Sequence, residues 1–170
     1  MSSFKFLVLA ATVATVAACG FQPLYGSRDG GSAPVEFAQI KIEPIPDRIG
    51  QQLHNHLLTI LNPDGRPERP RYVMKTQVSE SLSALGVRKT AFATRANLQM
   101  RATYNLTSAA IGKSVFNGDS TITVSYNILD SEFATLMAEK DARERAVREL
   151  AEDMRIRLGV FFASQAAQGK

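Results

Sequence analysis

The chain has 170 residues, of which 45% are hydrophobic, 21% charged and 8% aromatic. This is the composition of an ordinary globular protein of one domain, and it excludes a disordered chain, a collagen and a coiled-coil array. The chain has 20 Lys and Arg residues against 16 Asp and Glu residues, a formal net charge of +4. This excess is too small for the dense basic patch of a nucleic-acid-binding protein. The single cysteine excludes an internal disulfide and a zinc site built on several cysteines.

The N-terminal segment predicts export from the cytoplasm. Lys5 precedes an uncharged, mostly apolar run over residues 6–18. That run is shorter than the roughly 20 residues that a membrane-spanning helix needs. Residues 1–18 are therefore predicted to be a signal peptide that takes no part in the fold.

The end of this segment resembles a bacterial lipobox, in which small residues precede a cysteine that becomes the mature N-terminus. Residues 16–19 read Val-Ala-Ala-Cys, so Cys19 is the expected lipidation site. Two or more acyl chains on this residue would anchor the protein firmly, where a single chain anchors it only marginally. The alternatives are an unmodified cysteine after an ordinary signal peptide and a buried N-terminal helix. Gly20 stands where an Asp usually signals retention at the inner membrane, so the resemblance implies the outer membrane.

The rest of the chain divides into a tether, one domain and a tail. Residues 19–34 are expected to form the lipidated N-terminus and a flexible tether, because Gly, Ser and Pro are frequent there and no apolar period is present. Residues 35–162 are expected to form a single α+β domain. Residues 163–170 are expected to be a disordered tail.

Two short elements open the predicted domain. A strand is expected over residues 35–45, where apolar and polar residues alternate and two prolines end the pattern. Asp47 can then cap a helix that runs to about Leu61, because apolar residues recur at helical spacing. The stripe on this helix is formed by Ile49, Leu53, Leu57, Ile60 and Leu61.

Three longer strands follow over residues 71–82, 90–108 and 114–128, with Gly86 and Gly112 marking the hairpin turns. Apolar and polar residues alternate along each strand, so one face of the sheet is expected to meet the core. The expected inward residues are Tyr72, Met74, Val78, Leu82, Phe92, Leu98, Met100, Tyr104, Leu106, Phe116, Ile122, Val124, Tyr126 and Ile128.

A last, long helix is predicted from Asp130 or Ser131 to about Phe162. Its expected apolar stripe comprises Phe133, Leu136, Met137, Val147, Leu150, Met154, Leu158 and Phe161. The predicted order is β-α-β-β-β-α, and two helices can cover only one face of a four-stranded sheet. We therefore expect an α+β two-layer sandwich, whose mixed sheet is mostly antiparallel, with parallel pairing permitted only by the first, helical crossover.

Two stretches resemble the lipopolysaccharide-assembly lipoprotein family of proteobacterial outer membranes. Residues 19–26 read CGFQPLYG, like the mature N-terminus of that family, and residues 94–98 and 104–106 read TRANL and YNL, like its central strand. The resemblance implies a non-enzymatic outer-membrane lipoprotein that assembles lipopolysaccharide in the outer leaflet. It also implies a partner, a large outer-membrane β-barrel that the lipoprotein plugs and helps to fold.

The second face of the predicted sheet is polar and rich in amides and hydroxyls. One interpretation is the wet face of an antiparallel sheet, which is common. The other is contact with a hydrophilic enclosed surface such as the inside of a large barrel. The residues of this face include Lys75, Gln77, Arg95, Asn97, Gln99, Arg101, Thr103, Thr121, Thr123 and Ser125.

Four cations are candidate contacts for lipopolysaccharide, which carries phosphates and carboxylates. Arg88 and Lys89 lie in the loop between the second and third strands, where they could instead keep a hairpin tip soluble. Lys140 lies early in the last helix, and the resemblance implies a Lys-Asp pair there, matched by Lys140 and Asp141. Arg95 belongs to the family's Thr-Arg pair and could bind ligand, contact the barrel or order the sheet.

The residues give no support for an enzyme, a metal site or a cofactor. His54 and His56 are the only histidines, and two residues apart on a helix they point in different directions. No nucleophile motif or glycine-rich phosphate loop is present. The alternatives to the family's role are a lipoprotein subunit of an inner-membrane ABC-type lipid transporter and a lipid-tethered periplasmic hydrolase.

Overall fold

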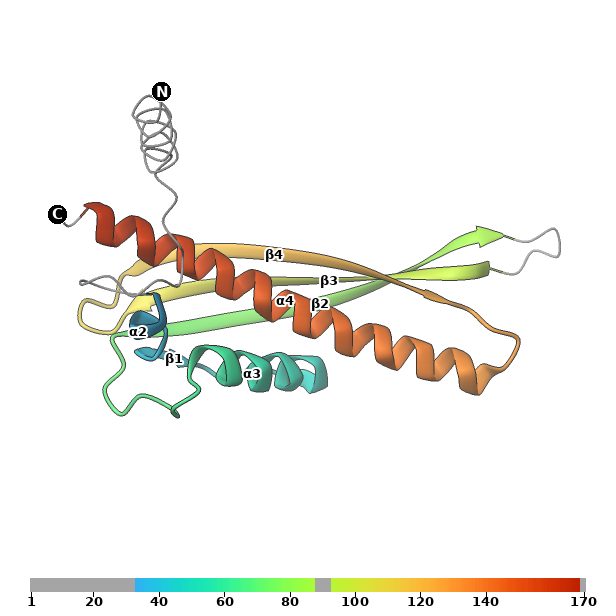
Figure 1. Cartoon of the computed structure of the whole chain (residues 1–170), viewed down its shortest axis with the longest axis horizontal. Coiled ribbons are helices and arrows are strands. Elements are labelled where there is room, and N and C mark those ends of the chain that lie inside the picture. The colour runs from blue at the N-terminus through green and yellow to red at the C-terminus, as the bar shows by residue number, and fades with distance from the viewer. Residues whose placement is uncertain (1–32, 88–92, 169–170) are drawn as a thin grey trace, which may run out of the picture.

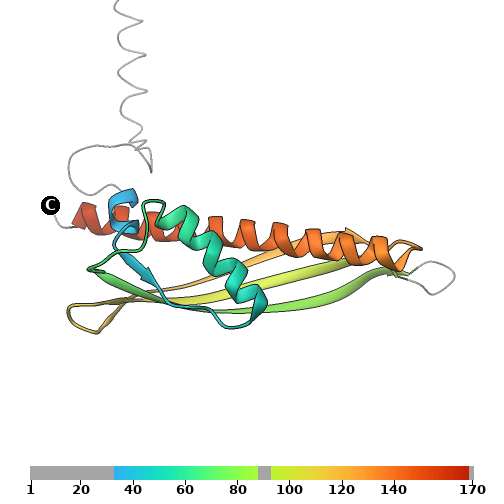
Figure 2. The same cartoon turned by 90° about the horizontal axis from the view of Figure 1, so that it is seen from below.

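The computed structural model describes residues 33–87 and 93–168 of the chain, in which four strands form one sheet with the long helices on one face (Figures 1 and 2). This is the predicted α+β two-layer arrangement, with one additional short helix. The elements are α2 (Ala33–Phe37), β1 (Ile40–Ile42), α3 (Asp47–Leu61), β2 (Tyr72–Val87), β3 (Ala93–Ser108), β4 (Ser114–Asn127) and α4 (Glu132–Gln168).

The sheet is mixed and its strand order is β1-β2-β3-β4. The short β1 pairs in parallel with the first residues of β2, because α3 carries the chain back along the sheet between them. The other pairs are antiparallel, and Leu98 of β3 lies opposite both Leu82 of β2 and Val124 of β4. The predicted mostly antiparallel sheet with one parallel pair is thus confirmed.

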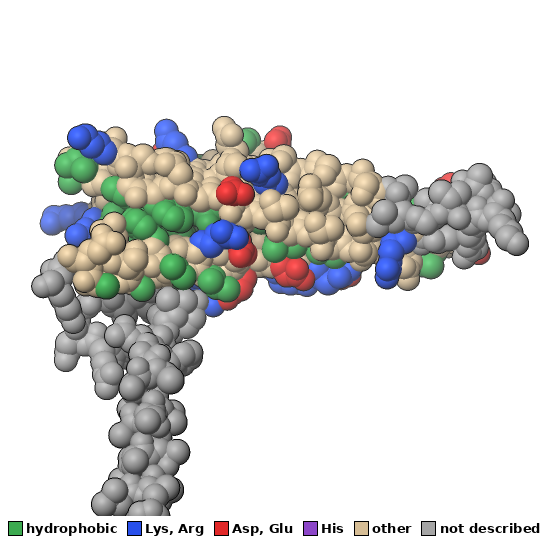
Figure 3. All heavy atoms as spheres, turned by 90° about the horizontal axis from the view of Figure 1, so that it is seen from above, with side chains coloured by type: hydrophobic (Ala, Val, Ile, Leu, Met, Phe, Trp, Pro, Cys, Tyr) green, Lys and Arg blue, Asp and Glu red, His purple; other side chains and the backbone are tan. Residues whose placement is uncertain are grey.

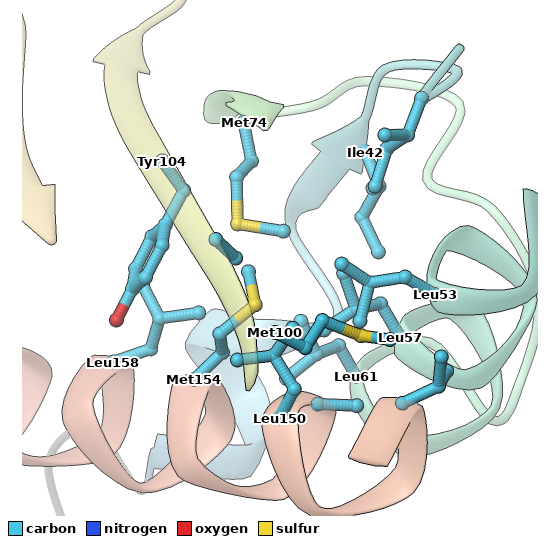
Figure 4. Packing of buried hydrophobic residues seen from close by; sticks show 14 of the residues in the cluster. Ile42, Leu53, Leu57, Leu61, Met74, Met100, Tyr104, Leu150, Met154 and Leu158 are labelled. Atoms are coloured by element: carbon cyan, nitrogen blue, oxygen red, sulfur yellow. The ribbon is translucent and has the colours of Figure 1, made fainter. Parts of the chain in front are cut away.

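The hydrophobic core lies between β3, α3 and α4. Leu53, Leu57 and Leu61 of α3 face Met100 of β3 and Leu150 of α4 (Figure 4). All five side chains are buried, and each stabilises the fold by roughly 1.5–3 kcal/mol relative to its exposed state. The alternation predicted for β3 is confirmed, since Leu98, Met100, Tyr104 and Leu106 are all buried.

The predicted first strand over residues 35–45 is wrong except at residues 40–42, and α4 continues beyond its predicted end near Phe162. Residues 33–37 form α2, which Pro34 permits because proline is tolerated in the first turn of a helix. Phe37 is buried with its ring centroid 6.0 Å from that of Phe162 in an edge-on contact, which holds α2 against α4. At the other end, alanines and glutamines with good helix propensity carry α4 on to Gln168.

The start of α3 differs from the predicted cap. Pro46 precedes the helix with no side-chain cap, and Asp47 is itself the first helical residue, with a positive φ of 66° that aspartate tolerates better than most residues. At the other end, Asn62 is buried, and its Nδ2 donates a 3.1 Å hydrogen bond to the Phe37 carbonyl. This bond ties the end of α3 to α2.

The predicted apolar stripe of α4 is buried only over its second part. Phe133, Leu136 and Met137 are 71%, 56% and 41% exposed. The reason is length, because α4 has 37 residues and spans about 55 Å, whereas α3 has 15 and spans about 22 Å. The first turns of α4 therefore run past the end of α3 (Figure 1). Small residues missing from the predicted stripe are buried instead, namely Ala142, Ala146 and Ala151.

Gly118 of β4 leaves room for the ring of Tyr104, its partner in the antiparallel register. A Cβ at this position would lie 2.4 Å from the Tyr104 Cζ, and the ring is buried. Gly118→Ala is therefore expected to destabilise the fold by about 1–3 kcal/mol, as overpacking does. Urea denaturation measures this, with Thr121→Ala on the exposed face of the same strand expected to stay within about 0.5 kcal/mol of the wild type. An unchanged midpoint for Gly118→Ala would contradict the expected crowding.

Candidate functional site

Three of the predicted site residues lie outside the described part of the chain, namely Cys19, Arg88 and Lys89. The predicted signal peptide also lies outside it, as do residues 19–32 of the predicted tether. The elements that flank residues 88–92 are described. Val87 of β2 pairs with Ala93 of β3, and both strands end there.

The hairpin end of β2 and β3 and the beginning of α4 lie at the same end of the molecule (Figure 1). Arg95 lies opposite Asn127, the last residue of β4, and α4 begins shortly afterwards at Glu132. The C-terminal end of α4 and α2 lie at the opposite end. The fold thus brings Arg95, Lys140 and the strand ends beside residues 88–92 toward one end.

Arg95 and Lys140 nevertheless lie on opposite sides of the sheet. Ala96 and Leu98 are buried beneath the helices, so Arg95, an exposed neighbour in the alternation, faces away from them. Lys140 is an exposed residue of α4, on the side that the helices cover. A single small ligand cannot meet both cations through the sheet.

The face turned away from the helices, called the outer sheet face below, carries mainly uncharged hydrogen-bonding groups. Ser125 donates a 2.7 Å hydrogen bond to Asn97 on the neighbouring strand. The Asn105 amide donates to both Ser114 and Asn117, at 2.5 Å each. The exposed polar residues of this face include Gln77, Ser79, Ser81, Arg95, Gln99, Arg101, Thr103, Thr121 and Thr123.

The charges on this part of the surface are few and partly paired. Arg101 lies 3.6 Å from Asp119, and Lys75 lies 3.8 Å from Glu43. Figure 3 views the molecule from the β4 side, where the charged side chains are scattered and hydrophobic side chains gather toward the end that carries the C-terminal part of α4. A hollow of about 480 Å³ lies on this face. Amide and hydroxyl groups of Gln77, Thr103, Asn105 and Asn117 line it together with the charged Lys75 and Asp119, so it can donate and accept hydrogen bonds.

A second hollow lies between the N-terminal turn of α3 and the first half of α4. It measures about 390 Å³, and we call it the α3–α4 notch. Arg143 forms one wall and is held by Glu80 of β2 at 2.9 Å and by Glu139 at 2.6 Å. The hydrogen bond that Arg143 donates to Glu80 raises the pKa of Arg143, because the carboxylate stabilises the charged guanidinium. The residues lining the notch are Arg48, Ile49, Gln52, Glu80, Leu136, Met137, Lys140, Arg143 and Glu144.

Arg48 and Lys140 are the two cations of the notch that form no ion pair with a described residue. Both are exposed, and they come from different helices. The sequence predicted Lys140 as a site residue but gave no signal for Arg48. No local pattern could have identified Arg48, because its place beside Lys140 follows from how α3 packs against α4.

The two histidines point in different directions, as the sequence predicted. His54 is buried and its Nδ1 has no hydrogen-bond partner, whereas His56 lines a separate hollow with Gln52 and Arg148. Within the described residues, no three His, Cys, Asp or Glu side chains gather in a way that could hold a metal ion. Neither hollow described above contains a histidine beside a serine.

His54 is expected to make the fold less stable in mild acid. Burial lowers its pKa below the usual 6.5, and the charge of Arg66 lowers it further, while the Glu43 backbone opposes both. The unfolded chain therefore takes up the proton first, so the stabilisation is complete above about pH 6.5 and is lost as the pH falls through the folded-state pKa.

Urea denaturation between pH 5 and 7.5 measures this dependence. The His54→Leu chain is expected to lose less stability than the wild type across that range, whereas His56→Gln is expected to lose as much as the wild type. Equal pH slopes for the wild type and His54→Leu would contradict the role of His54.

The comparisons with known proteins agree with this fold. A protein of Caulobacter crescentus CB15 that is named a lipoprotein has a crystal structure with a TM-score of 0.61 and 24% identity, covering 77% of this chain and 96% of its own. Rare lipoprotein B of Shewanella oneidensis gives a TM-score of 0.56 at 12% identity, covering 76% of this chain and 97% of its own. The minor lipoprotein of Acinetobacter baumannii gives a TM-score of 0.56 at 15% identity, and the match covers 73% of this chain and 92% of its own. At these identities the likeness shows a shared fold.

Among curated protein sequences, no significant match to the chain is found. No helix in residues 33–87 and 93–168 has both the length and the hydrophobicity that crossing a membrane requires. Residues 37–158 match the lipopolysaccharide-assembly family (LptE). The matched range includes β3 with its TRANL and YNL stretches. The match covers most of the chain and all of the sheet, which confirms the predicted resemblance. The chain therefore belongs to the lipopolysaccharide-assembly family.

Proposed function

We propose that this protein is a non-enzymatic lipoprotein, anchored through Cys19 on the periplasmic side of the outer membrane, that places lipopolysaccharide in the outer leaflet together with a β-barrel partner. It plugs the barrel and assists its folding, and it binds lipopolysaccharide. The observation that carries the proposal is the family match over residues 37–158, to which the polar outer sheet face adds support.

The outer sheet face supports contact with the inside of a barrel. The lumen of a large outer-membrane barrel is polar and is closed in some proteins by a plug. A plug must therefore present hydrogen-bonding groups without many unpaired charges, because a charge buried without a partner is costly. Rows of Ser, Thr, Asn and Gln along β2, β3 and β4 meet this requirement. The N-terminal end of the described chain lies away from the hairpin end, so the domain can extend away from a membrane anchor (Figure 1).

Affinity capture from solubilised outer membranes tests the partner. The full chain, captured through a C-terminal tag, is expected to bring down one large β-barrel protein in a stable complex. A chain with Asn97, Gln99 and Thr123 changed to Lys is expected to lose that complex. A control chain with Gln51, Arg148 and Glu149 of the helices changed to Lys is expected to keep the complex. Capture of inner-membrane transporter subunits alone would contradict the proposal and indicate the alternative ABC-type role.

The hairpin cations are expected to bind the anionic groups of lipopolysaccharide. Reversing Arg88 and Lys89 to Glu is expected to weaken lipopolysaccharide binding by about tenfold or more, because charge-assisted hydrogen bonds to phosphate are lost and repulsion replaces them. Barrel capture is expected to stay unchanged. Binding of purified lipopolysaccharide to the full chain measures this.

The matched control reverses two cations at the opposite end of the sheet, Arg69 and Lys113, which are also exposed. This variant keeps the same change in net charge and is expected to bind as the wild type does. If both variants weaken binding equally, the effect comes from net charge and not from the hairpin, and Arg88 and Lys89 are removed from the site.

A further inference from the structure

The outward side of the last turns of α4 is apolar. Ile156 and Val160 are 43% and 57% exposed. Ala163 and Ala167, which are also exposed, continue the same helical face, because the four residues follow one another at spacings of four, three and four. Leu158 lies two positions from both Ile156 and Val160, which is about 200° around the helix, and it is buried in the core. These four residues, called the outward α4 stripe below, therefore point away from the sheet.

The stripe is confined to the C-terminal part of α4. Glu149 lies two turns before Ile156 on the same face and is exposed and charged, as a solvated helix face requires. Beyond it, α4 is apolar on two opposite sides, which is typical of a helix that is covered on both. Val35 of α2 adds a further aliphatic side chain at this end, 55% exposed. Single exposed apolar residues are ordinary, whereas an adjacent group of them marks a contact surface.

The chain enters the domain beside this stripe. α2 lies next to the C-terminal part of α4 on the helix-covered side of the sheet, where the ring contact between Phe37 and Phe162 holds it (Figure 2). The expected anchor, Cys19, stands 14 residues before Ala33, the first residue of α2. An extended chain of that length spans about 50 Å at most, so this end of the domain stays near the bilayer while the hairpin end can lie farther away. A contact needs little affinity of its own when a tether keeps it close to its surface.

The size and surroundings of the stripe favour a phospholipid surface over a protein. A standard protein interface takes roughly 20–30 residues from each partner, many more than the stripe and Val35 supply. Two ion pairs flank the beginning of the stripe, Arg157 with Asp153 at 2.7 Å and Arg155 with Glu152. At the boundary between headgroups and acyl chains, these charges can stay among the headgroups while the aliphatic side chains between them reach the hydrocarbon.

We propose that, in the protein free of its barrel partner, the outward α4 stripe and Val35 lie against the phospholipid of the leaflet that holds the lipid anchor. This inference rests on the proposed function for the anchor at Cys19, and it adds a contact between the folded domain and the membrane. Because the sheet lies on the other side of α4, the contact turns the outer sheet face toward the periplasm. A barrel chain that arrives from the periplasm can then reach that face.

Fluorescence quenching tests the contact. The lipidated protein is purified without its partner and placed in vesicles of phosphatidylethanolamine and phosphatidylglycerol whose acyl chains carry bromine, which quenches a fluorophore that reaches the hydrocarbon. Dansylalanine replaces Val160, and in a matched chain it replaces Phe133, which is exposed near the other end of α4. Bromine is expected to quench the probe at 160 about threefold or more beyond the probe at 133, because only the first lies against the leaflet.

Two pairs of substitutions in the chain with the probe at 160 locate the contact. Val35→Glu with Ile156→Glu is expected to lower the quenching to the level at 133, because two carboxylates then oppose entry into the hydrocarbon. Leu136→Glu with Met137→Glu makes the same change in net charge on exposed residues near the other end of α4 and is expected to leave the quenching as it was.

Flotation of the protein with the vesicles separates the contact from the anchor. Flotation with equal quenching at 160 and 133 overturns the contact and leaves the anchor in place. Failure to float overturns the anchor and, with it, the contact that depends on it. Blue-shifted emission at 160 that bromine does not quench overturns the contact by showing that a second copy of the protein covers the stripe. Undiminished quenching in Val35→Glu with Ile156→Glu also overturns it.

Discussion

Replacing Cys19 with serine is expected to release the protein from the membrane fraction into the soluble periplasm. The expected modification joins a diacylglyceryl group to the sulfur of Cys19, and serine has no sulfur for that reaction. Each acyl CH₂ buried in the bilayer contributes about 0.8 kcal/mol, so loss of two or more chains removes essentially all of the anchoring. Labelling with radioactive palmitate followed by fractionation measures both the modification and the location.

Gly20→Asp provides the matched control, because it changes the residue beside the anchor and leaves the thiol in place. This variant is expected to keep the palmitate label and to move toward the inner membrane. Label that persists in Cys19→Ser would contradict lipidation at this residue. Retention of the unlabelled variant in the outer membrane would show that the partner, and not the lipid, holds the protein there.

Leu150→Ala is expected to lower the free energy of unfolding by about 2–5 kcal/mol. Leu150 is fully buried at the place where α4 crosses α3 and β3, close to Leu61 and Met100 (Figure 4). Truncation removes buried hydrocarbon and leaves a cavity that elements from three directions cannot easily close. For a domain of ordinary stability this is a large share of the 5–15 kcal/mol available.

Urea denaturation of the full chain measures this loss, with Ile156→Ala as the control on the same helix. Ile156 is 43% exposed, so its truncation is expected to cost about 1 kcal/mol or less. Equal costs for the two variants would contradict the packing of α4 against α3.

Periodicity identified the elements that are long and regular. The alternation in β3 predicted Leu98, Met100 and Leu106 on the core face, and all three are buried. The spacing of Leu53 and Leu57 likewise predicted the buried face of α3, whose bounds match the prediction. Both patterns are local, because a side chain's direction along a strand or helix follows from its position in the chain.

Coverage by neighbouring elements could not be predicted in the same way. Phe133 and Leu136 share a helical face with Val147 and Leu150, but only the second pair is buried. Only the N-terminal turn of α3 comes near Leu136, and a hollow separates the two. The burial of Ala146 also depends on this packing, since a small residue gives no apolar signal of its own. Helix periodicity tells which residues lie together and not what lies against them.

The candidate site shows the same division. The sequence predicted Arg95 and Lys140 as candidate ligand contacts, and the structure brings both toward one end of the molecule while the sheet separates them. Arg48 had no signal in the sequence, because its place beside Lys140 arises only when α3 packs on α4. The outer sheet face was predicted well, since alternation along β3 and β4 fixes which polar residues face away from the helices.

Depletion of the protein tests its role in lipopolysaccharide assembly most directly. The measurement is the amount of newly made lipopolysaccharide that an antibody can reach on intact cells after expression is stopped. Surface lipopolysaccharide is expected to fall as the protein is lost, with folded barrel partner falling alongside, and the wild-type chain is expected to restore both. Unchanged delivery of new lipopolysaccharide to the surface in depleted cells would contradict the proposed function.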